Sequence, residues 1–414
     1  MAIVRPFKGL KVNPEFAKEV ASPPYDVLNT KEARSMAGSN PRSFLRVNKS
    51  ELEFDDSVDP YSEIVYKRAK ENLEKFESQG VMARDKKPCF YLYRITMDGR
   101  PQTGLVALTS VEEYEEGKIK KHEHTRPEKV NDRARHMEIV GAQVGPVLST
   151  FRHNDEISRI FKRVTSKKAE IVFVADDGVR HELWVVEDGK TIKEIENAFA
   201  KLDCLYIADG HHRSESAAEL CRRMKKANKN HTGKEPYNYF INVIFPDNEL
   251  AIMPYNRVVK DLNDMTLDQF LHRISDKFSV TPQNGEINPS KLHTFGFYND
   301  GKWYLLEAKP GTFDPKHSTQ SLDASILAEN LIGPVLGITN PRTDKRIDFV
   351  GGIRGTKGLE RLVNSGEYKA AFSVYPTSIE QLLNVADRGE VMPPKSTWFE
   401  PKLRDGLVVY LLND

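Results

Sequence analysis

Residues 205–220 read LYIADGHHRSESAAEL, and this stretch sets the expected local fold. The residues CLYIA at 204–208 form an apolar run that is typical of a strand. Beyond position 213, apolar side chains recur at the spacing of one helix face, at Ala217, Leu220, Cys221 and Met224. The sequence therefore predicts a strand that turns into a helix, with DGHHR at 209–213 forming the turn.

The residue types of DGHHR favour an anion site at this turn. The first backbone N–H groups of a helix lack intrahelical partners and lie at the positive end of the helix dipole. Gly210 lets a ligand approach the backbone closely, and Arg213 can grip phosphate oxygens with its guanidinium fork. His211 and His212 can donate further hydrogen bonds. A simpler interpretation makes Asp209 a helix cap and the other side chains surface polar groups, but two histidines and an arginine are not needed for a cap.

The composition limits the classes of partner. The 61 Lys and Arg residues balance 60 Asp and Glu residues, so a net charge of +1 gives no overall field for nucleic acid or an anionic membrane. The three cysteines include no CxxC pair and are expected to be reduced thiols. No segment has the pattern of a signal peptide or of a membrane span, so we expect a cytoplasmic protein.

The rest of the chain alternates strand and helix patterns. We expect a helix with Asp59 as N-cap, Pro60 in its first turn and Gly80 at its end. Three hairpins are predicted, with turns at 98–99, 177–178 and 299–301. Hairpins mixed with helices indicate an α+β fold with mixed or antiparallel sheets. We expect three regions, residues 1–203, 204–285 and 286–414.

A second candidate site lies at 118–136, in KIKKHEHTRPEKVNDRARH. Thr125 and Glu128 have the spacing of a capping box, which places HEH just before a helix. In an extended segment His122 and His124 point to one side and Glu123 to the other. The histidines are then candidate metal ligands, or Glu123 is a general base with the histidines packed behind it. A solvated polar loop is the third interpretation.

Three further stretches contain candidate anion-binding side chains. Arg257 follows a strand pattern, Arg354 lies among glycines in GGIRGTKG, and Lys395 follows two prolines in MPPKSTWF. The glycine-rich stretch lacks the order of a P-loop. These residues are candidates for binding a substrate carboxylate, and simple structural roles remain open for them.

The motifs RPFKGL, ASPPYDVL, KHEHT, ADGHHR, PYNRVVKDLN and MPPKSTWF resemble, over the whole chain, the bacterial and archaeal domain-of-unknown-function family 1015. The DGHHR box is also similar to the phosphate-binding box of the ParB and sulfiredoxin-like superfamily, and closest to its free-serine kinases. This resemblance implies a core of that type at 204–285, nucleotide binding by residues 210–213, and catalysis by Asp209 with Glu123 and His124 of the upstream loop. Glu123 would be the base that acts on the substrate hydroxyl.

The sequence and the resemblance together predict an ATP- or ADP-dependent kinase that uses Mg²⁺ and phosphorylates a small metabolite, for example free L-serine to O-phosphoserine. One alternative is a metal-dependent hydrolase with ligands among His122, His124, Asp209, His211 and His212. Another is a nucleotide-binding regulatory protein without turnover. The sequence does not identify the metal ligands. It also leaves the oligomeric state open, and a homo-oligomer is one of the alternatives.

Overall fold

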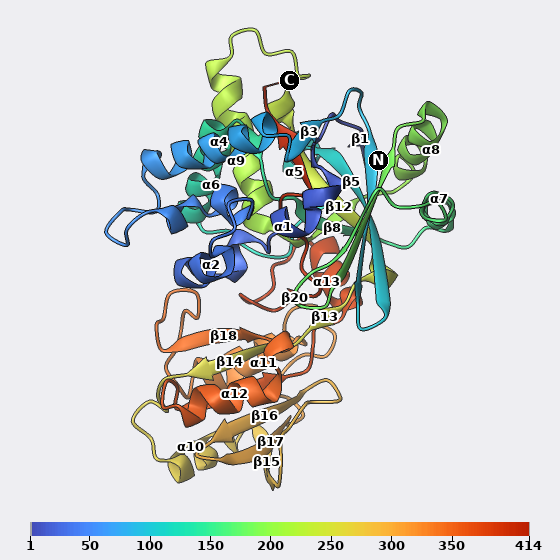
Figure 1. Ribbon diagram of the computed structural model, residues 1–414. Helices are drawn as coiled ribbons and strands as arrows, with labels where there is room; N and C mark the ends of the chain where they lie inside the picture. Colours follow the sequence, from blue (N-terminus) through green and yellow to red (C-terminus); the bar gives the residue numbers. More distant parts are fainter. Residues whose placement is uncertain (1, 414) are drawn as a thin grey trace. The chain divides into compact units, whose positions relative to one another are not determined.

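The strand that precedes DGHHR lies inside a mixed sheet, shown with the rest of the chain in Figure 1. The computed structural model describes residues 2–413. Within these residues the sheet has nine strands in the order β6-β11-β8-β12-β5-β4-β10-β9, with β1 beside β5. The strands are β1 (Val4–Arg5), β4 (Phe90–Met97), β5 (Arg100–Ser110), β6 (Ile119–Lys120), β8 (Val147–Phe151), β9 (Ile171–Val174), β10 (Arg180–Val186), β11 (Leu205–Asp209) and β12 (Tyr239–Pro246).

The central strands of this sheet are apolar because they are covered on both faces. All eight residues of β12, YFINVIFP, are buried. One face packs against α5 (Val111–Glu115), α7 (Asp155–Thr165), α8 (Gly189–Phe199) and α9 (His211–Ala227) in a single apolar core. The pairing is mixed, since β8 is parallel to β12 and antiparallel to β11.

Helices from the first third of the chain lie beside α9, where α4 and α6 pack on one another (Figure 1). These helices are α1 (Ala17–Val20), α2 (Thr30–Ala37), α3 (Leu45–Asn48), α4 (Glu63–Ser78) and α6 (Pro127–Val140). A small sheet joins the two ends of the chain, because β21 (Val408–Leu411) pairs with both β2 (Leu10–Val12) and β7 (Ala142–Gln143). The strand β3 (Met82–Arg84) pairs with β2 on its other side.

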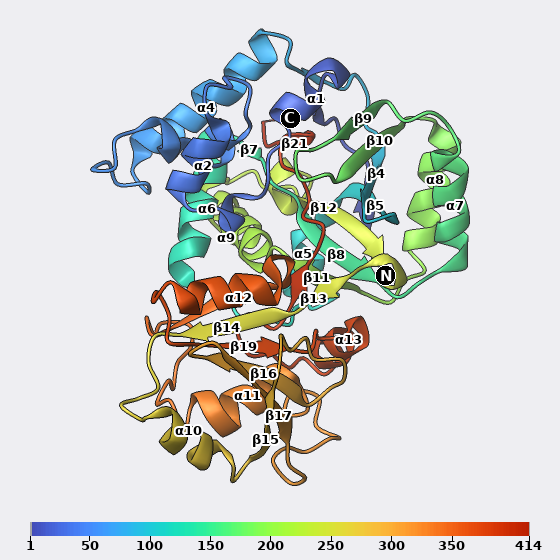
Figure 2. The same ribbon diagram turned by 60° about the horizontal axis from the view of Figure 1, so that its bottom comes forward.

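A second, antiparallel sheet carries the remainder of the chain, in the order β15-β17-β16-β19-β14-β18. Its strands are β14 (Tyr255–Val259), β15 (Phe278–Gln283), β16 (Thr294–Asn299), β17 (Lys302–Ala308), β18 (Ile347–Gly351) and β19 (Ala370–Val374). Helices α10 (Leu267–Ile274) and α11 (Asp323–Leu327) pack on one face, and α12 (Gly355–Asn364) packs on the other, as Figure 2 shows. The helix α13 (Ile379–Asp387) and the short ribbon of β13 (Ile252–Met253) with β20 (Trp398–Phe399) complete this part.

The chain forms two compact units, each with its own core. Unit 1 holds the residues up to 121, 125–250 and those from 401 onward, and unit 2 holds 122–124 and 251–400. These units differ from the predicted regions 1–203, 204–285 and 286–414. The reason is strand pairing. The strand β11 lies just after the predicted boundary at 203, but it pairs with β8, which lies before that boundary, so both strands belong to the same unit.

The α+β fold class is confirmed, and so are the three hairpins. Each turn contains at least one residue with a positive φ angle, for example 51° at Asp98 and 76° at Gly99. The predicted caps of two helices, α4 and α6, were wrong. The N-cap of α4 is Ser62, while Asp59 accepts a hydrogen bond from the N–H of Tyr61. The predicted capping box at 125–128 does not form, because Arg126 is the N-cap residue and Pro127 opens α6.

Within residues 2–413, no helix combines the length and the apolar character that crossing a bilayer requires.

The unit 1 core gives a first prediction. Phe199 is fully buried and packs edge-on against Phe151, with ring centroids 5.3 Å apart. We expect Phe199→Ala to lower the free energy of unfolding by about 3–5 kcal/mol, because it leaves a cavity in the core. Val172→Ala, at a position with 45% exposure, should change it by less than about 0.5 kcal/mol. Equal effects of the two substitutions in urea denaturation would contradict this packing.

Candidate functional site

The DGHHR motif forms the predicted strand-to-helix turn. Strand β11 ends at Asp209, Gly210 is the N-cap residue, and α9 begins at His211. Gly210 has φ 93° and ψ 30°, a left-handed conformation that a residue with a side chain adopts only with strain. Glycine also has no side chain that could cap the helix. The positive end of a 17-residue helix therefore lies directly behind a glycine turn.

The carboxylate of Asp209 is fixed beside this turn. Its Oδ1 accepts the N–H of Gly210 at 2.9 Å, and its Oδ2 lies 2.8 Å from Nζ of Lys402. The Asp209 side chain is 41% exposed, whereas that of Lys402 is 14% exposed. Asp209 is thus not the cap of α9. It is a half-exposed acid, and its partner Lys402 is a cation at the mouth of the turn.

The two histidines of the motif have different surroundings. His211 is buried, and burial lowers its pKa to about 3, so its imidazole is neutral at pH 7. The Nε2 atom of His212 accepts the N–H of Arg126 at 3.1 Å. A neutral imidazole that accepts at Nε2 carries its proton on Nδ1. Through His212 the turn is therefore joined to the start of α6.

The guanidinium of Arg213 lies inside unit 1. Its Nη1 donates to the carbonyl of Pro146 at 2.7 Å, and its Nη2 donates to Oδ1 of Asp26 at 3.2 Å. Its Nη1 also lies 3.9 Å from Oδ1 of Asp405, and the side chain is 9% exposed. Burial lowers the pKa of Arg213, but the charges of Asp26 and Asp405 outweigh it and raise the pKa above its usual value. Among residues 2–413 its Nε has no hydrogen-bond partner, so one N–H of the predicted fork remains unused.

Asp405 is the fully buried member of this group. Its Oδ2 accepts a hydrogen bond from Nδ2 of Asn48 at 2.7 Å, and its side chain is 1% exposed. Burial raises the pKa of Asp405 to about 6, although Arg213 and Asn48 lower it. Arg213 and Asp405 thus connect the turn to the C-terminal segment, while Asp26 connects it to ASPPYDVL.

The HEH segment is part of unit 2, so Glu123 and His124 belong to a different unit from the turn. The carbonyl of His122 accepts the N–H of Met392 at 2.9 Å, and its buried Nε2 lies 3.4 Å from Oγ1 of Thr397. Within unit 2 the segment therefore contacts the MPPKST stretch. Glu123 is half-buried and His124 is exposed. Their catalytic roles stay predictions.

The three candidate substrate-binding residues all lie in unit 2. Arg257 is buried in β14, and it donates to the carbonyl of Tyr255 and, at 3.4 Å, to the carbonyl of Lys395. Burial lowers the pKa of Arg257 to about 10. Lys395 is exposed, with its Nζ 5.5 Å from the centre of the Tyr255 ring, and Arg354 is exposed where α12 begins. The structure brings Arg257 and Lys395 together through the backbone.

Metal ligands do not gather in this structure. Among residues 2–413, no three His, Cys, Asp or Glu side chains are placed to hold a metal ion together. His122 instead contacts Met392 and Thr397 within unit 2, and His212 of the turn accepts the N–H of Arg126 next to the start of α6.

The sequence analysis did not identify three residues that contact the turn, Asp26, Lys402 and Asp405. Asp26 had a visible signal, since it belongs to the motif ASPPYDVL. Lys402 and Asp405 had none, because their partners Asp209 and Arg213 lie more than 190 positions earlier in the chain.

Comparison with known proteins identifies the chain's family. The model of the family described as "Protein of unknown function (DUF1015)" matches residues 4–325. No match is found among curated proteins.

Some solved structures are weakly similar. A conserved hypothetical protein from Pyrococcus furiosus is 15% identical, with 74% of this chain and 95% of that chain covered and a TM-score of 0.36. Free serine kinase in complex with AMP is 13% identical, with coverages of 71% and 86% and a TM-score of 0.35. SbnI with C-terminal truncation, from Staphylococcus aureus, is 12% identical, with coverages of 74% and 87% and a TM-score of 0.37. Similarities of this size transfer no activity to the chain.

The buried acid gives a prediction about pH. Because the folded-state pKa of Asp405, about 6, exceeds the usual value near 4, the folded state holds this proton more tightly than the unfolded state. The stability that Asp405 contributes is therefore complete below about pH 4 and is lost as the pH rises through 6. Between pH 4 and 7, we expect the unfolding free energy of wild type to fall by about 2–3 kcal/mol relative to Asp405→Asn. Parallel pH profiles in chemical denaturation would show that Asp405 ionises normally.

Proposed function

The chain belongs to the DUF1015 family, and we propose that it is a nucleotide-dependent phosphotransferase that uses ATP or ADP. The acceptor is the hydroxyl of a small metabolite, with free L-serine as the favoured example. The observation that carries this proposal is the glycine turn between β11 and α9, flanked by Asp209 and Lys402.

The turn suits a phosphate group physically. The positive end of α9 attracts an anion, and the glycine lets phosphate oxygens approach the backbone. Lys402 adds a positive charge whose side chain is mostly buried and held in place by Asp209. Phosphoryl transfer depends mainly on positioning and on neutralising charge, and these residues can supply both.

The choice of a nucleotide over another anion is supported by the likeness of DGHHR to the phosphate box of free-serine kinases. In that assignment residues 210–213 bind the nucleotide, with Arg213 acting mainly by holding the turn in shape. Arg213 fits this positioning role because both Nη atoms bond to unit 1 groups.

Glu123 is the proposed base for the acceptor hydroxyl, with His124 beside it. This role is supported by the resemblance of DGHHR to the box of free-serine kinases, in which a glutamate of an upstream loop acts as the base. In that role the carboxylate of Glu123 would take the hydroxyl proton while the hydroxyl oxygen bonds to the terminal phosphorus of the nucleotide and the bond from that phosphorus to the leaving nucleotide breaks.

The substrate carboxylate is assigned to the exposed side chains of Lys395 and Arg354. Arg257 then acts as a positioning residue, because it holds the carbonyl of Lys395. Mg²⁺, when bound, would neutralise phosphate charge, and the half-exposed carboxylate of Asp209 is the group that would hold it, directly or through water.

Nucleotide binding is tested by thermal shift. We expect ADP or ATP with Mg²⁺ to raise the melting temperature of the full chain, since a ligand of the folded state stabilises it. Lys402→Gln should remove most of the rise, while Lys190→Gln, at an exposed position on α8, should keep it. Lys402 is preferred over Arg213 here because loss of the buried Arg213 would disturb folding itself. No rise with either nucleotide would contradict the proposal.

The role of Glu123 is tested by turnover. In an assay that follows phosphate transfer to L-serine and other hydroxyl compounds, we expect Glu123→Gln to lower kcat by about 10²–10⁴-fold with the nucleotide-induced thermal shift unchanged. Glu128→Gln, in the exposed first turn of α6, is the matched control. Full turnover in Glu123→Gln would rule Glu123 out as the base. Nucleotide binding without turnover on any acceptor would point to a regulatory protein.

A further inference from the structure

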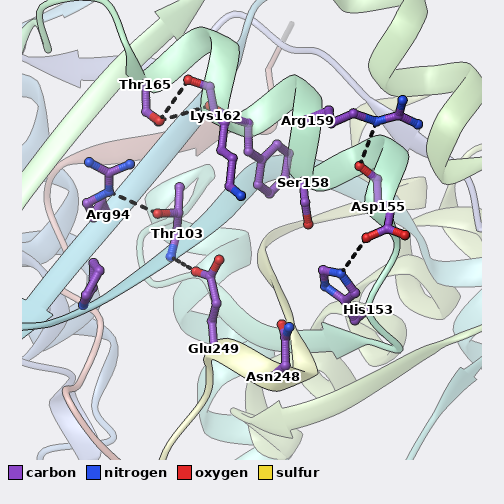
Figure 3. A pocket seen from close by; sticks show the side chains of 12 residues that line it. Arg94, Thr103, His153, Asp155, Ser158, Arg159, Lys162, Thr165, Asn248 and Glu249 are labelled. Atoms are coloured by element: carbon purple, nitrogen blue, oxygen red, sulfur yellow. Dashed lines mark hydrogen bonds and ion pairs between the residues drawn. The ribbon is translucent and has the colours of Figure 1, made fainter.

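A cavity of about 690 Å³ lies in unit 1, lined by α7, the hairpin of β4 and β5, and the short helix η5 (Asp247–Glu249) (Figure 3). Its volume is in the range of pockets that hold small molecules. The cavity and the DGHHR turn lie at opposite ends of β8. Asp209 is level with Leu148 of β8, whereas His153, which lines the cavity, comes after the last residue of β8. The two places are therefore separated by residues 149–151 of β8 and by the loop that follows them.

One wall of the cavity is the polar face of α7. Asp155, Ser158, Arg159 and Lys162 follow one another at helical spacing, and the opposite face of the helix is buried in the core. In Figure 3, Lys162 and Ser158 point from the helix into the cavity, toward Glu249.

Within the described residues no carboxylate pairs with Arg159, whose Nε donates to the carbonyl of Asp155, and none pairs with Lys162. Arg163, next to it on α7, pairs with Glu194, and Lys201 pairs with Glu156. In the part of the chain that the structure describes, no carboxylate lies within ion-pair distance of Lys162. Its positive charge is therefore available to a ligand.

The opposite wall carries one acid, Glu249, and one further cation, Arg94. Oε2 of Glu249 accepts the N–H of Thr103 at 2.6 Å, and Nε of Arg94 donates to Oγ1 of Thr103 at 3.0 Å. The Arg94 guanidinium also stacks over the Trp184 ring at 4.9 Å. Arg100 holds η5 in place by donating to the carbonyls of Glu249 and Leu250, at 3.1 and 2.8 Å.

Burial raises the pKa of Glu249, while the N–H of Thr103 and the nearby charges of Arg94, His153 and Lys162 lower it. The same cations that would bind an anion thus also act on Glu249.

We propose that this cavity binds a small dicarboxylate that carries a hydroxyl or ammonium group. Lys162 and Arg94, on facing walls, take the two carboxylates, and Glu249 accepts a hydrogen bond from the third group. This second site is independent of the proposed phosphotransfer.

Calorimetric titration of the full chain with succinate, L-malate and L-aspartate tests this proposal. The three probes share two carboxylates and differ in having no donor, a hydroxyl or an ammonium group. We expect malate and aspartate to bind about tenfold more tightly than succinate, because each adds a hydrogen bond to a charged acceptor. Lys162→Gln should weaken binding of all three by about tenfold or more, and Glu249→Gln should remove the preference over succinate.

Lys190→Gln is again the matched control and should bind like wild type. The nucleotide-induced thermal shift of Lys162→Gln should equal that of wild type, because the DGHHR turn is intact. The proposal is overturned if no probe binds at about 10 mM, if Lys162→Gln binds like wild type, or if wild type binds the three probes equally.

Discussion

The buried charge of Arg213 is the constraint on which the arrangement around the turn depends. An arginine that is 9% exposed requires compensation, because an unpaired charge inside a protein is strongly destabilising. The compensation comes from Asp26 near the start of the chain, the carbonyl of Pro146 before β8, and Asp405 near its end. One side chain of the motif therefore ties three distant segments to the first turn of α9.

Two residues that contact the turn lie just after the points where the chain returns to unit 1. His212 binds Arg126, two residues after the HEH segment leaves unit 2. Asp209 binds Lys402, two residues after the chain leaves unit 2 for the last time. Both returns of the chain to unit 1 thus end at the DGHHR turn.

Local features of the structure were predictable from the sequence, and long-range pairing was not. The strand, glycine and helix of residues 205–220 follow from periodicity and backbone freedom, as do the hairpin turns at Asp98–Gly99 and 177–178. The inward direction of Arg213 could not be predicted, because it depends on carboxylates about 190 positions away on either side. The cavity beside α7 could not be predicted either, because Arg94, Lys162 and Glu249 come from three elements that are far apart in the sequence. The predicted caps at Asp59 and Thr125 were wrong, because α4 begins after Ser62 and α6 begins at Pro127.

The central claim, that nucleotide phosphate binds at Gly210, is tested most directly by nuclear magnetic resonance of the chain labelled with ¹⁵N-glycine. The 25 glycines give a sparse spectrum, and Gly210→Ala identifies the resonance of Gly210. On titration with ADP and Mg²⁺ we expect the Gly210 amide to shift more than any other glycine. An unchanged Gly210 resonance, with shifts confined to the glycines of 351–358 or absent altogether, would contradict the claim.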